Sequence, residues 1–166
     1  RLFEESLAEH RRAGLRDFEG YALSDLAILH RQTGRVDLAA EELERALVLM
    51  RESGLRHGEA LVHSNLGLLR LETGRLEDAD RHFEAALPLF RARGDSRAEA
   101  RLLTNVAILR IESGRPDEAE RLLGEAIKRI HRGESVGALF SSEVSFTQEM
   151  LLWEDGLGRG REPSPG

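Results

Sequence analysis

The sequence contains no cysteine, which excludes disulfide bonds and thiolate metal sites and favours a reducing compartment. Aromatic residues are only 5% of the chain, so a core must be built mainly from Leu, Ala, Ile and Val. No apolar run approaches the ~20 residues that a membrane-spanning helix needs. We therefore expect a cytoplasmic protein that has no membrane partner.

An excess of positive charge is also missing. The formal net charge is −6 and the pI is near 5.6, so no general attraction to nucleic acid or anionic lipid is expected. Arg70, Arg101 and Arg110 suggest a basic stripe, but Glu72 and Glu112 interrupt it and no stacking aromatic residues accompany it. Nucleic acid is therefore not an expected partner.

Motifs that carry catalysis or bind metals are missing as well. The sequence has no HExxH pattern and no GxSxG context, and its glycines stand singly at predicted helix ends rather than in a phosphate-binding loop. Its six histidines lack tight ligand spacing, so each is interpreted as a packed or solvated residue. The carboxylates stand beside arginines at helical spacing, as Glu41 and Arg45 do, which favours a role in solubility. We expect no enzymatic activity, no metal and no cofactor.

What the sequence does contain is an internal repeat of 40 residues. A shift by that distance lays the chain on itself and carries Gly14 onto Gly54 and Gly94. The other columns that align in this way are Gly34-Arg35, Gly74-Arg75 and Gly114-Arg115; Leu29, Leu69 and Leu109; Ala39, Ala79 and Ala119; and Ala46, Ala86 and Ala126. Similarity at a fixed period is the sequence signature of a repeat architecture.

Each repeat unit predicts two helices. The first covers residues 18–33, where apolar residues recur at helical spacing until Gly34 ends the helix. The second opens with an acidic residue, Asp37 in the first unit, and is ended by Gly54. One pair cannot bury its apolar face, whereas about three stacked pairs can, so we predict an all-α fold of antiparallel helix pairs. Small residues at one point of the first helices should let neighbouring helices approach closely: Ala27, Gly67 and Ala107.

The middle unit carries a family resemblance. It contains Asn65-Leu66-Gly67, Glu72-Thr73-Gly74-Arg75-Leu76-Glu77-Asp78-Ala79 and Phe83-Glu84-Ala85-Ala86-Leu87. These segments resemble the tetratricopeptide repeat (TPR) consensus. The period of 40 is similar to that of the long-helix subgroup in kinesin light chain, Pins-like polarity adaptors and large bacterial regulators. The resemblance implies a right-handed α-α superhelix, a TPR solenoid, that serves as a scaffold for protein–protein interaction.

The repeat pattern fades towards both ends of the chain. Because residues 1–12 match only the second half of a repeat, we expect the chain to be a fragment of a larger regulatory protein. The expected segments are the second helix of a truncated preceding repeat (1–13), three repeats (14–53, 54–93 and 94–133), a C-terminal capping helix (134–153) and a flexible tail (154–166).

The first helices of such a superhelix line its concave groove. Steps of three, four and seven residues place one set of side chains together on that side of each first helix. The predicted peptide-binding groove consists of Tyr21, Ser24, Asp25 and Ile28; Leu61, Ser64, Asn65 and Leu68; and Arg101, Thr104, Asn105 and Ile108.

Asp25, Asn65 and Asn105 form a polar column within the predicted groove. An Asn side chain can donate and accept hydrogen bonds at once, which suits the backbone of an extended peptide. The family resemblance implies that backbone-contacting role for Asn65 and Asn105, and less directly for Asp25, which cannot donate. The other interpretation is that these residues solvate the groove or bond a neighbouring helix. Ser24 and Ile28 stand where the family's carboxylate clamp has Lys and Asn, so acidic chaperone tails are not expected partners.

Two functions from different classes remain open. The first is a scaffold that binds a peptide or protein segment in the groove. The second is self-association, a homodimer formed through the terminal helices: residues 1–12 at one end and an apolar end segment at the other. The large apolar residues of that segment include Phe140, Phe146, Met150 and Trp153.

Overall fold

The computed structural model describes residue 12 and residues 15–131. Within these residues the chain consists of helices joined by short turns, and it contains no strand. The helices are α2 (Arg16–Gln32), α3 (Val36–Glu52), α4 (Arg56–Glu72), α5 (Leu76–Arg93) and α6 (Ser96–Glu112), followed by a helix over residues 116–131. The predicted all-α fold is confirmed.

Glycine ends each of the five labelled helices. Gly54 has a φ of 67°, its N–H donates to the carbonyl of Arg51 (3.1 Å), and the next N–H, of Leu55, donates to the carbonyl of Met50 (2.9 Å). This double hydrogen bond closes a helix C-terminus, and it requires a left-handed residue that glycine adopts without strain. The same pattern recurs at Gly34, Gly74, Gly94 and Gly114.

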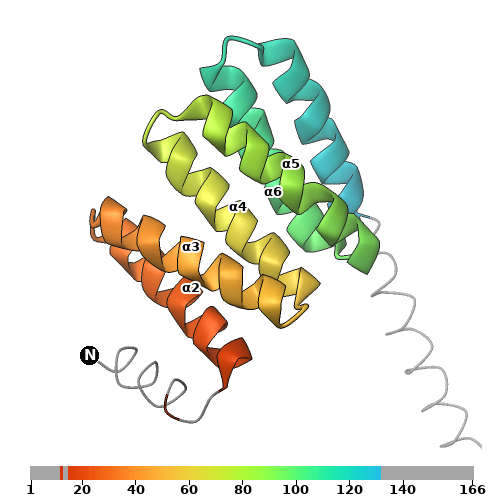
Figure 1. Ribbon diagram of the computed structural model, residues 1–166. Coiled ribbons are helices and arrows are strands. Elements are labelled where there is room, and N and C mark those ends of the chain that lie inside the picture. The colour runs from red at the N-terminus through yellow and green to blue at the C-terminus, as the bar shows by residue number, and fades with distance from the viewer. Residues whose placement is uncertain (1–11, 13–14, 132–166) are drawn as a thin grey trace, which may run out of the picture.

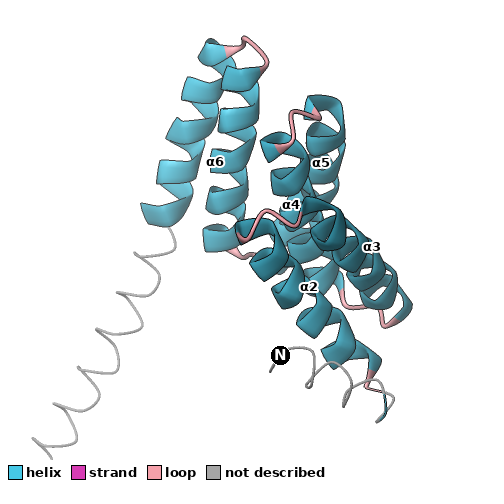
Figure 2. Ribbon diagram, turned by 90° about the vertical axis from the view of Figure 1, so that its left-hand side faces the viewer, coloured by secondary structure: helices cyan, strands magenta, loops and turns pink. Residues whose placement is uncertain are grey.

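Successive helices run antiparallel and stack as pairs (Figure 1). Helix α2 packs against α3, and α4 packs against α5, while the contacts of α3 with α4 and of α5 with α6 join one pair to the next. After a turn of 90°, α6 is seen to be inclined to α2, as expected when each stacked pair is rotated relative to the last (Figure 2). The chain is a helical solenoid.

The core runs through the stack as a continuous series of apolar clusters. Leu23, Leu43 and Leu66 belong to one cluster that joins α2, α3 and α4. Phe83 and Leu102 belong to a second cluster that joins α4, α5 and α6. The alanine columns are buried as their spacing predicts: Ala27, Ala39, Ala46, Ala79, Ala86, Ala107, Ala119 and Ala126.

A close approach between α4 and α5 explains why the second repeat has Gly67 where the others have alanine. A Cβ on Gly67 of α4 would stand 2.4 Å from the ring of Phe83 on α5. The predicted role of small residues in helix approach is therefore confirmed at this position.

Several sequence predictions fall outside the described residues. These are the truncated preceding repeat apart from Arg12, the capping helix over 134–153 and the tail over 154–166. Among the helices that are described, none is long and apolar enough to cross a membrane.

Candidate functional site

The first helices of successive pairs lie side by side. Helix α4 contacts both α2 and α6. Two polar contacts join α2 to α4: Asn65 donates from Nδ2 to Oγ of Ser24 (3.3 Å), and the Arg31 guanidinium pairs with the Glu72 carboxylate. The three first helices therefore lie side by side, and we call the surface formed by the residues predicted for the groove the first-helix face.

The predicted groove residues differ in how far they are accessible. Ser24 and Ser64 are buried, so neither is readily accessible to a ligand, and the Ser24 hydroxyl accepts the hydrogen bond from Asn65. The exposed members are Tyr21, Asp25, Arg101, Thr104 and Ile108, and the half-buried members are Ile28, Leu61, Asn65, Leu68 and Asn105.

The polar column keeps hydrogen-bonding capacity for a ligand. Asn65 donates to Ser24, which leaves its carboxamide oxygen without a protein partner within residues 15–131. Among the same residues, the carboxamide of Asn105 makes no side-chain hydrogen bond. Burial raises the pKa of Asp25 above its ordinary value. The column thus offers two amides and one carboxyl group that forms no ion pair with another described residue.

Apolar side chains flank this column. Tyr21 is 38% exposed and Ile108 is 43% exposed, although both are large apolar residues. Leu61 instead packs against the core cluster of α4, α5 and α6, and the Thr104 hydroxyl donates to the carbonyl of Ala100 (3.0 Å) in its own helix. Tyr21 and Ile108 are therefore the more accessible apolar contacts, and Leu61 and Thr104 contribute less.

A hollow of about 500 Å³ adjoins Tyr21 at one end of the face. It lies against the start of α4 and the end of α5, and His57 lines it. Nδ1 of His57 is buried and has no hydrogen-bond partner among the residues that the structure describes. Burial lowers the pKa of His57, and the charges of Arg93 and Arg101 act in the same direction while Asp95 opposes them. Two wall residues of the hollow, Arg56 and Arg93, are cationic, a feature of this end of the face that sequence reasoning missed.

A second hollow, of about 410 Å³, lies between α5, α6 and the helix over 116–131. Its walls include the apolar side chains of Phe83, Leu103 and Leu122, and its rim includes Arg110, which donates two hydrogen bonds to Asp80 (2.9 and 2.8 Å). The first-helix face does not extend into this hollow, because none of the predicted groove residues lines it.

Three glutamates at the 40-residue period are buried, contrary to the interpretation of the carboxylates as solvent-exposed. Glu19, Glu59 and Glu99 are 8%, 7% and 3% exposed. Glu59 accepts from Nε of Arg51 (2.8 Å), and Glu99 accepts from Nε of Arg91 (2.7 Å), so the same ion pair recurs at successive junctions. The arginines and the glutamates of this ion pair both recur at the 40-residue period, and this recurrence was the signal for the pair in the sequence.

The expected pairing of Arg45 with Glu41 is also wrong. Arg45 pairs instead with Glu19 across the first helix pair, at 3.1 Å. A carboxylate held in a nearly buried position attracts the guanidinium more strongly than an exposed neighbour on the same helix, because water screens it less. Among the described residues, no cluster of three or more His, Asp or Glu side chains could hold a metal ion.

Antiparallel helix pairs that recur at a 40-residue period define a helical-repeat protein. Two profiles of the tetratricopeptide repeat family match the chain, over residues 20–45 and 58–130. The chain belongs to the tetratricopeptide repeat family, whose repeats generally mediate protein–protein interactions.

The fold also matches solved structures. The crystal structure of BtubC (BKLC) from P. vanneervenii is similar with a TM-score of 0.67 and 20% sequence identity, covering 99% of this chain and 77% of that chain. At this identity the likeness is one of fold alone. No curated protein matches the chain.

Proposed function

We propose that the chain is a protein–protein interaction scaffold that binds an extended peptide segment of a partner protein on its first-helix face. The observation that carries this proposal is the carboxamide column. An extended backbone presents donors and acceptors in turn, and a carboxamide can satisfy both kinds of group. Asn105, with no side-chain partner among the described residues, and the free oxygen of Asn65 are suited to this contact.

The rest of the face supplies the contacts that would give specificity. Tyr21 and Ile108 are exposed apolar side chains on either side of the column. Arg93, a wall residue of the hollow at the Tyr21 end, supplies a positive charge there. We infer a partner segment with apolar side chains along its length and an acidic group at this end.

The test begins with a displayed peptide library, which supplies a binding sequence. The affinity of the selected peptide is then measured for the unmutated chain, for Asn105→Ala, and for the double variant Asn65→Ala with Asn105→Ala. Each lost hydrogen bond should weaken binding by ~0.5–1.5 kcal/mol. The matched control is Glu41→Ala with Glu120→Ala, which removes exposed polar groups from second helices of the same stack.

Equal affinities of the asparagine variants and the unmutated chain would contradict the proposal. A loss of affinity in the glutamate control of the same size would contradict it too, because the effect would then not depend on the first-helix face.

Self-association is the second candidate, and one observation favours it. Leu123, Ile127 and Ile130 on the helix over 116–131 are 38%, 57% and 42% exposed, whereas Phe83 and Phe90, located 40 residues before Leu123 and Ile130, are 1% exposed. Another element would cover this apolar face in a longer stack. Light scattering over a hundredfold range of concentration tests the idea: a stable dimer that Ile127→Glu dissociates supports it, and a monomer throughout rejects it.

A further inference from the structure

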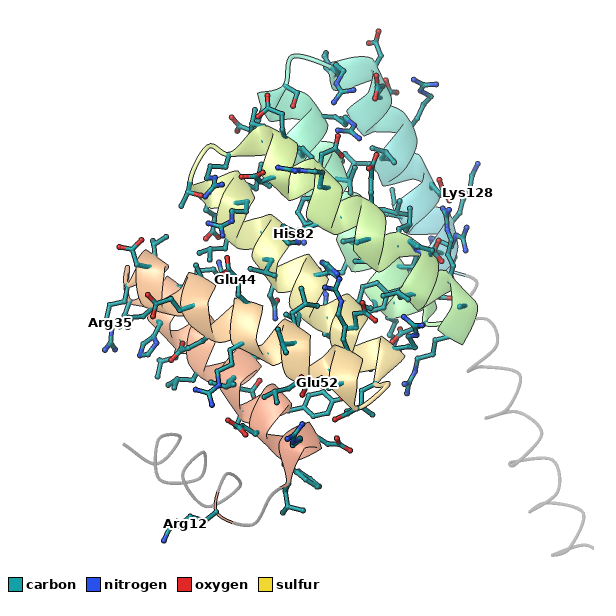
Figure 3. The ribbon with its side chains drawn as sticks, in the orientation of Figure 1. Arg12, Arg35, Glu44, Glu52, His82 and Lys128 are labelled. Carbon is teal, nitrogen blue, oxygen red and sulfur yellow. The ribbon has the colours of Figure 1, made fainter. Side chains whose placement is uncertain are left out.

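Two histidines lie in direct contact inside the middle helix pair. Nδ1 of His63 on α4 is 3.0 Å from Nδ1 of His82 on α5, and the ring centroids are 5.3 Å apart. His63 is 6% exposed and His82 is half-buried, between the ribbons of α4 and α5 in Figure 3. At the same positions one repeat later the chain has Leu103 and Leu122. A polar pair thus occupies a place that the third repeat fills with apolar side chains.

The guanidinium of Arg51 on α3 fixes the protons of this pair. Nη2 of Arg51 lies 3.1 Å from Nε2 of His63, and arginine can only donate. Nε2 of His63 must therefore accept, so the neutral ring carries its proton on Nδ1. That N–H donates to Nδ1 of His82, whose own proton lies on Nε2. Because Nε of Arg51 also donates to Glu59 (2.8 Å), the chain of hydrogen bonds joins α3, α4 and α5 and requires both rings to be neutral.

Charged groups from all three helices face the rings. They are Arg51 and Glu44 on α3, Glu59 and Arg70 on α4, and Asp78 and Arg81 on α5. Burial lowers the pKa of His63 to about 4, assisted by His82 and Arg51 and opposed by Glu59. Burial also lowers the pKa of His82, and the charges of Arg70 and Arg81 add to this effect against Asp78 and Glu44.

A proton on either ring breaks the chain of hydrogen bonds. A protonated His63 has no acceptor for Arg51 and places an imidazolium against a guanidinium. A protonated His82 places an N–H against the N–H of His63. Since Arg51 belongs to the first helix pair and His63 belongs to the second, the repulsion of a protonated His63 acts at the junction between the pairs. The repulsion of a protonated His82 acts on the same hydrogen-bonded chain through His63. The hydrogen bond from Asn65 to Ser24 lies on another side of α4. Asn65 stands two residues after His63, and two residues correspond to a rotation of about 200° about the helix axis.

We propose that His63 and His82 form a proton-operated joint between the first two helix pairs, closed at neutral pH and opened in mild acid. This inference does not depend on the proposed function. Opening would tilt α2 and α3 away from α4 and so change the shape of the first-helix face.

The direction of the pH effect follows from linkage. Histidines of the unfolded or opened chain titrate near pH 6.5, whereas the closed joint binds protons only at lower pH. The open state therefore binds more protons between about pH 6.5 and 4. The stability of the junction is complete above about pH 6.5 and is lost as the pH falls towards 4.

The neighbouring carboxylates become protonated only at lower pH. At Glu59 burial raises the pKa, but hydrogen bonds from Arg51 and Arg56 outweigh it and leave the pKa below its ordinary value. At Asp78 hydrogen bonds from Arg81 and Arg75 lower the pKa. Both groups therefore stay ionised in the closed state between pH 5 and pH 7.5, where the histidines can be measured separately.

The first experiment uses the unmutated 166-residue chain. Nitrogen NMR of the imidazole rings between pH 7.5 and 4.5 reports the tautomer and the titration of each assigned histidine. We expect His63 as the Nδ1–H tautomer, neutral at pH 6, and His82 as the Nε2–H tautomer with its pKa below the ordinary value. Titration of His63 near pH 6.5, or the opposite tautomer of His63, would overturn the proposal.

The second experiment measures backbone hydrogen exchange at pH 7.5 and pH 5.0, corrected for the intrinsic rates. Amide protection in α3 and in the first half of α4 should fall at least tenfold in acid, while protection in α6 should change less. In His63→Leu with His82→Leu, which installs the residue types of the third repeat, this acid effect should disappear. His131→Gln, at an exposed position, should behave as the unmutated chain does.

A parallel loss of protection in the leucine variant and the unmutated chain would contradict the joint, as would a uniform loss across all helices. If the leucine variant fails to fold, the NMR titration of the unmutated chain decides the question by itself.

Discussion

Gly67 on α4 lies directly against the ring of Phe83 on α5, so that a Cβ added to the glycine would stand 2.4 Å from Cε1 and 2.5 Å from Cδ1 of the ring. The first repeat has Ala27 and Leu43 at the equivalent positions, and the third has Ala107 and Leu123. The middle repeat thus combines a larger side chain on one helix with a smaller residue on the other.

Gly67→Ala should therefore destabilise the chain, because the new methyl group overlaps the ring of Phe83. Overpacking of this kind costs ~1–3 kcal/mol of unfolding free energy. The double variant Gly67→Ala with Phe83→Leu has the combination found in the other two repeats. Its loss of unfolding free energy should be smaller than the sum of the two single losses by ~1 kcal/mol or more. Denaturant unfolding of the three variants measures the coupling. Additive losses would show that the two positions are not fitted to each other.

Glu99 should be more important for stability than an exposed glutamate. It is 3% exposed and accepts hydrogen bonds from Arg91 and Arg129, each at 2.7 Å. Glu99→Gln keeps the shape but removes the buried charge that Arg91 and Arg129 share, so that among the described residues both guanidiniums keep only Glu125, and this should cost ~1–3 kcal/mol. Glu120→Gln, at an exposed position, is the matched control and should stay within ~0.5 kcal/mol. Equal effects of the two changes would argue against a structural ion pair at Glu99.

The two asparagines should differ in their effect on folding. Asn65→Ala removes the hydrogen bond to Ser24 and should cost ~0.5–1.5 kcal/mol of unfolding free energy. Asn105→Ala, which breaks no hydrogen bond between described residues, should change stability by less than ~0.5 kcal/mol. Thermal or denaturant unfolding separates the two. A large loss in Asn105→Ala would mean that this side chain has a structural role.

The apolar face of the helix over 116–131 should be covered in solution. Ile127→Glu should then destabilise the chain or dissociate a dimer, at a cost of ~1–3 kcal/mol for the lost burial. Lys128→Glu, the exposed neighbouring residue, is the control and should have little effect. If Ile127→Glu is as harmless as the control, the face is open to water.

Much of the fold could be predicted because it repeats. The glycines at the helix ends, such as Gly34 and Gly54, each require the same left-handed backbone, and the alanine columns mark where helices approach. These glycines and alanines have the same environment in each repeat, so a single unit explains the others. The predicted start of the first helix at residue 18 was late by two residues, since α2 begins at Arg16.

Features that depend on contacts between repeats were harder to predict. Glu59 looks like any exposed acid on a helix, and its burial depends on Arg51 arriving from the preceding pair. The contact between His63 and His82 could not be read from spacing, because residues on two antiparallel helices meet through packing rather than periodicity. The groove prediction had a related limit: Ser24 and Ser64 share the face with Asn65, yet the neighbouring helix covers them.

The central claim is that a partner segment binds on the first-helix face, and the most direct test is to locate a bound peptide. A selected peptide is labelled with a nitroxide at either end, which is convenient because the chain has no cysteine that could take the label in exchange. Amide signals broadened by the label are then mapped. The account predicts broadening along α2, α4 and α6 around Asp25, Asn65 and Asn105. Broadening centred on the hollow between α5, α6 and residues 116–131 would contradict it.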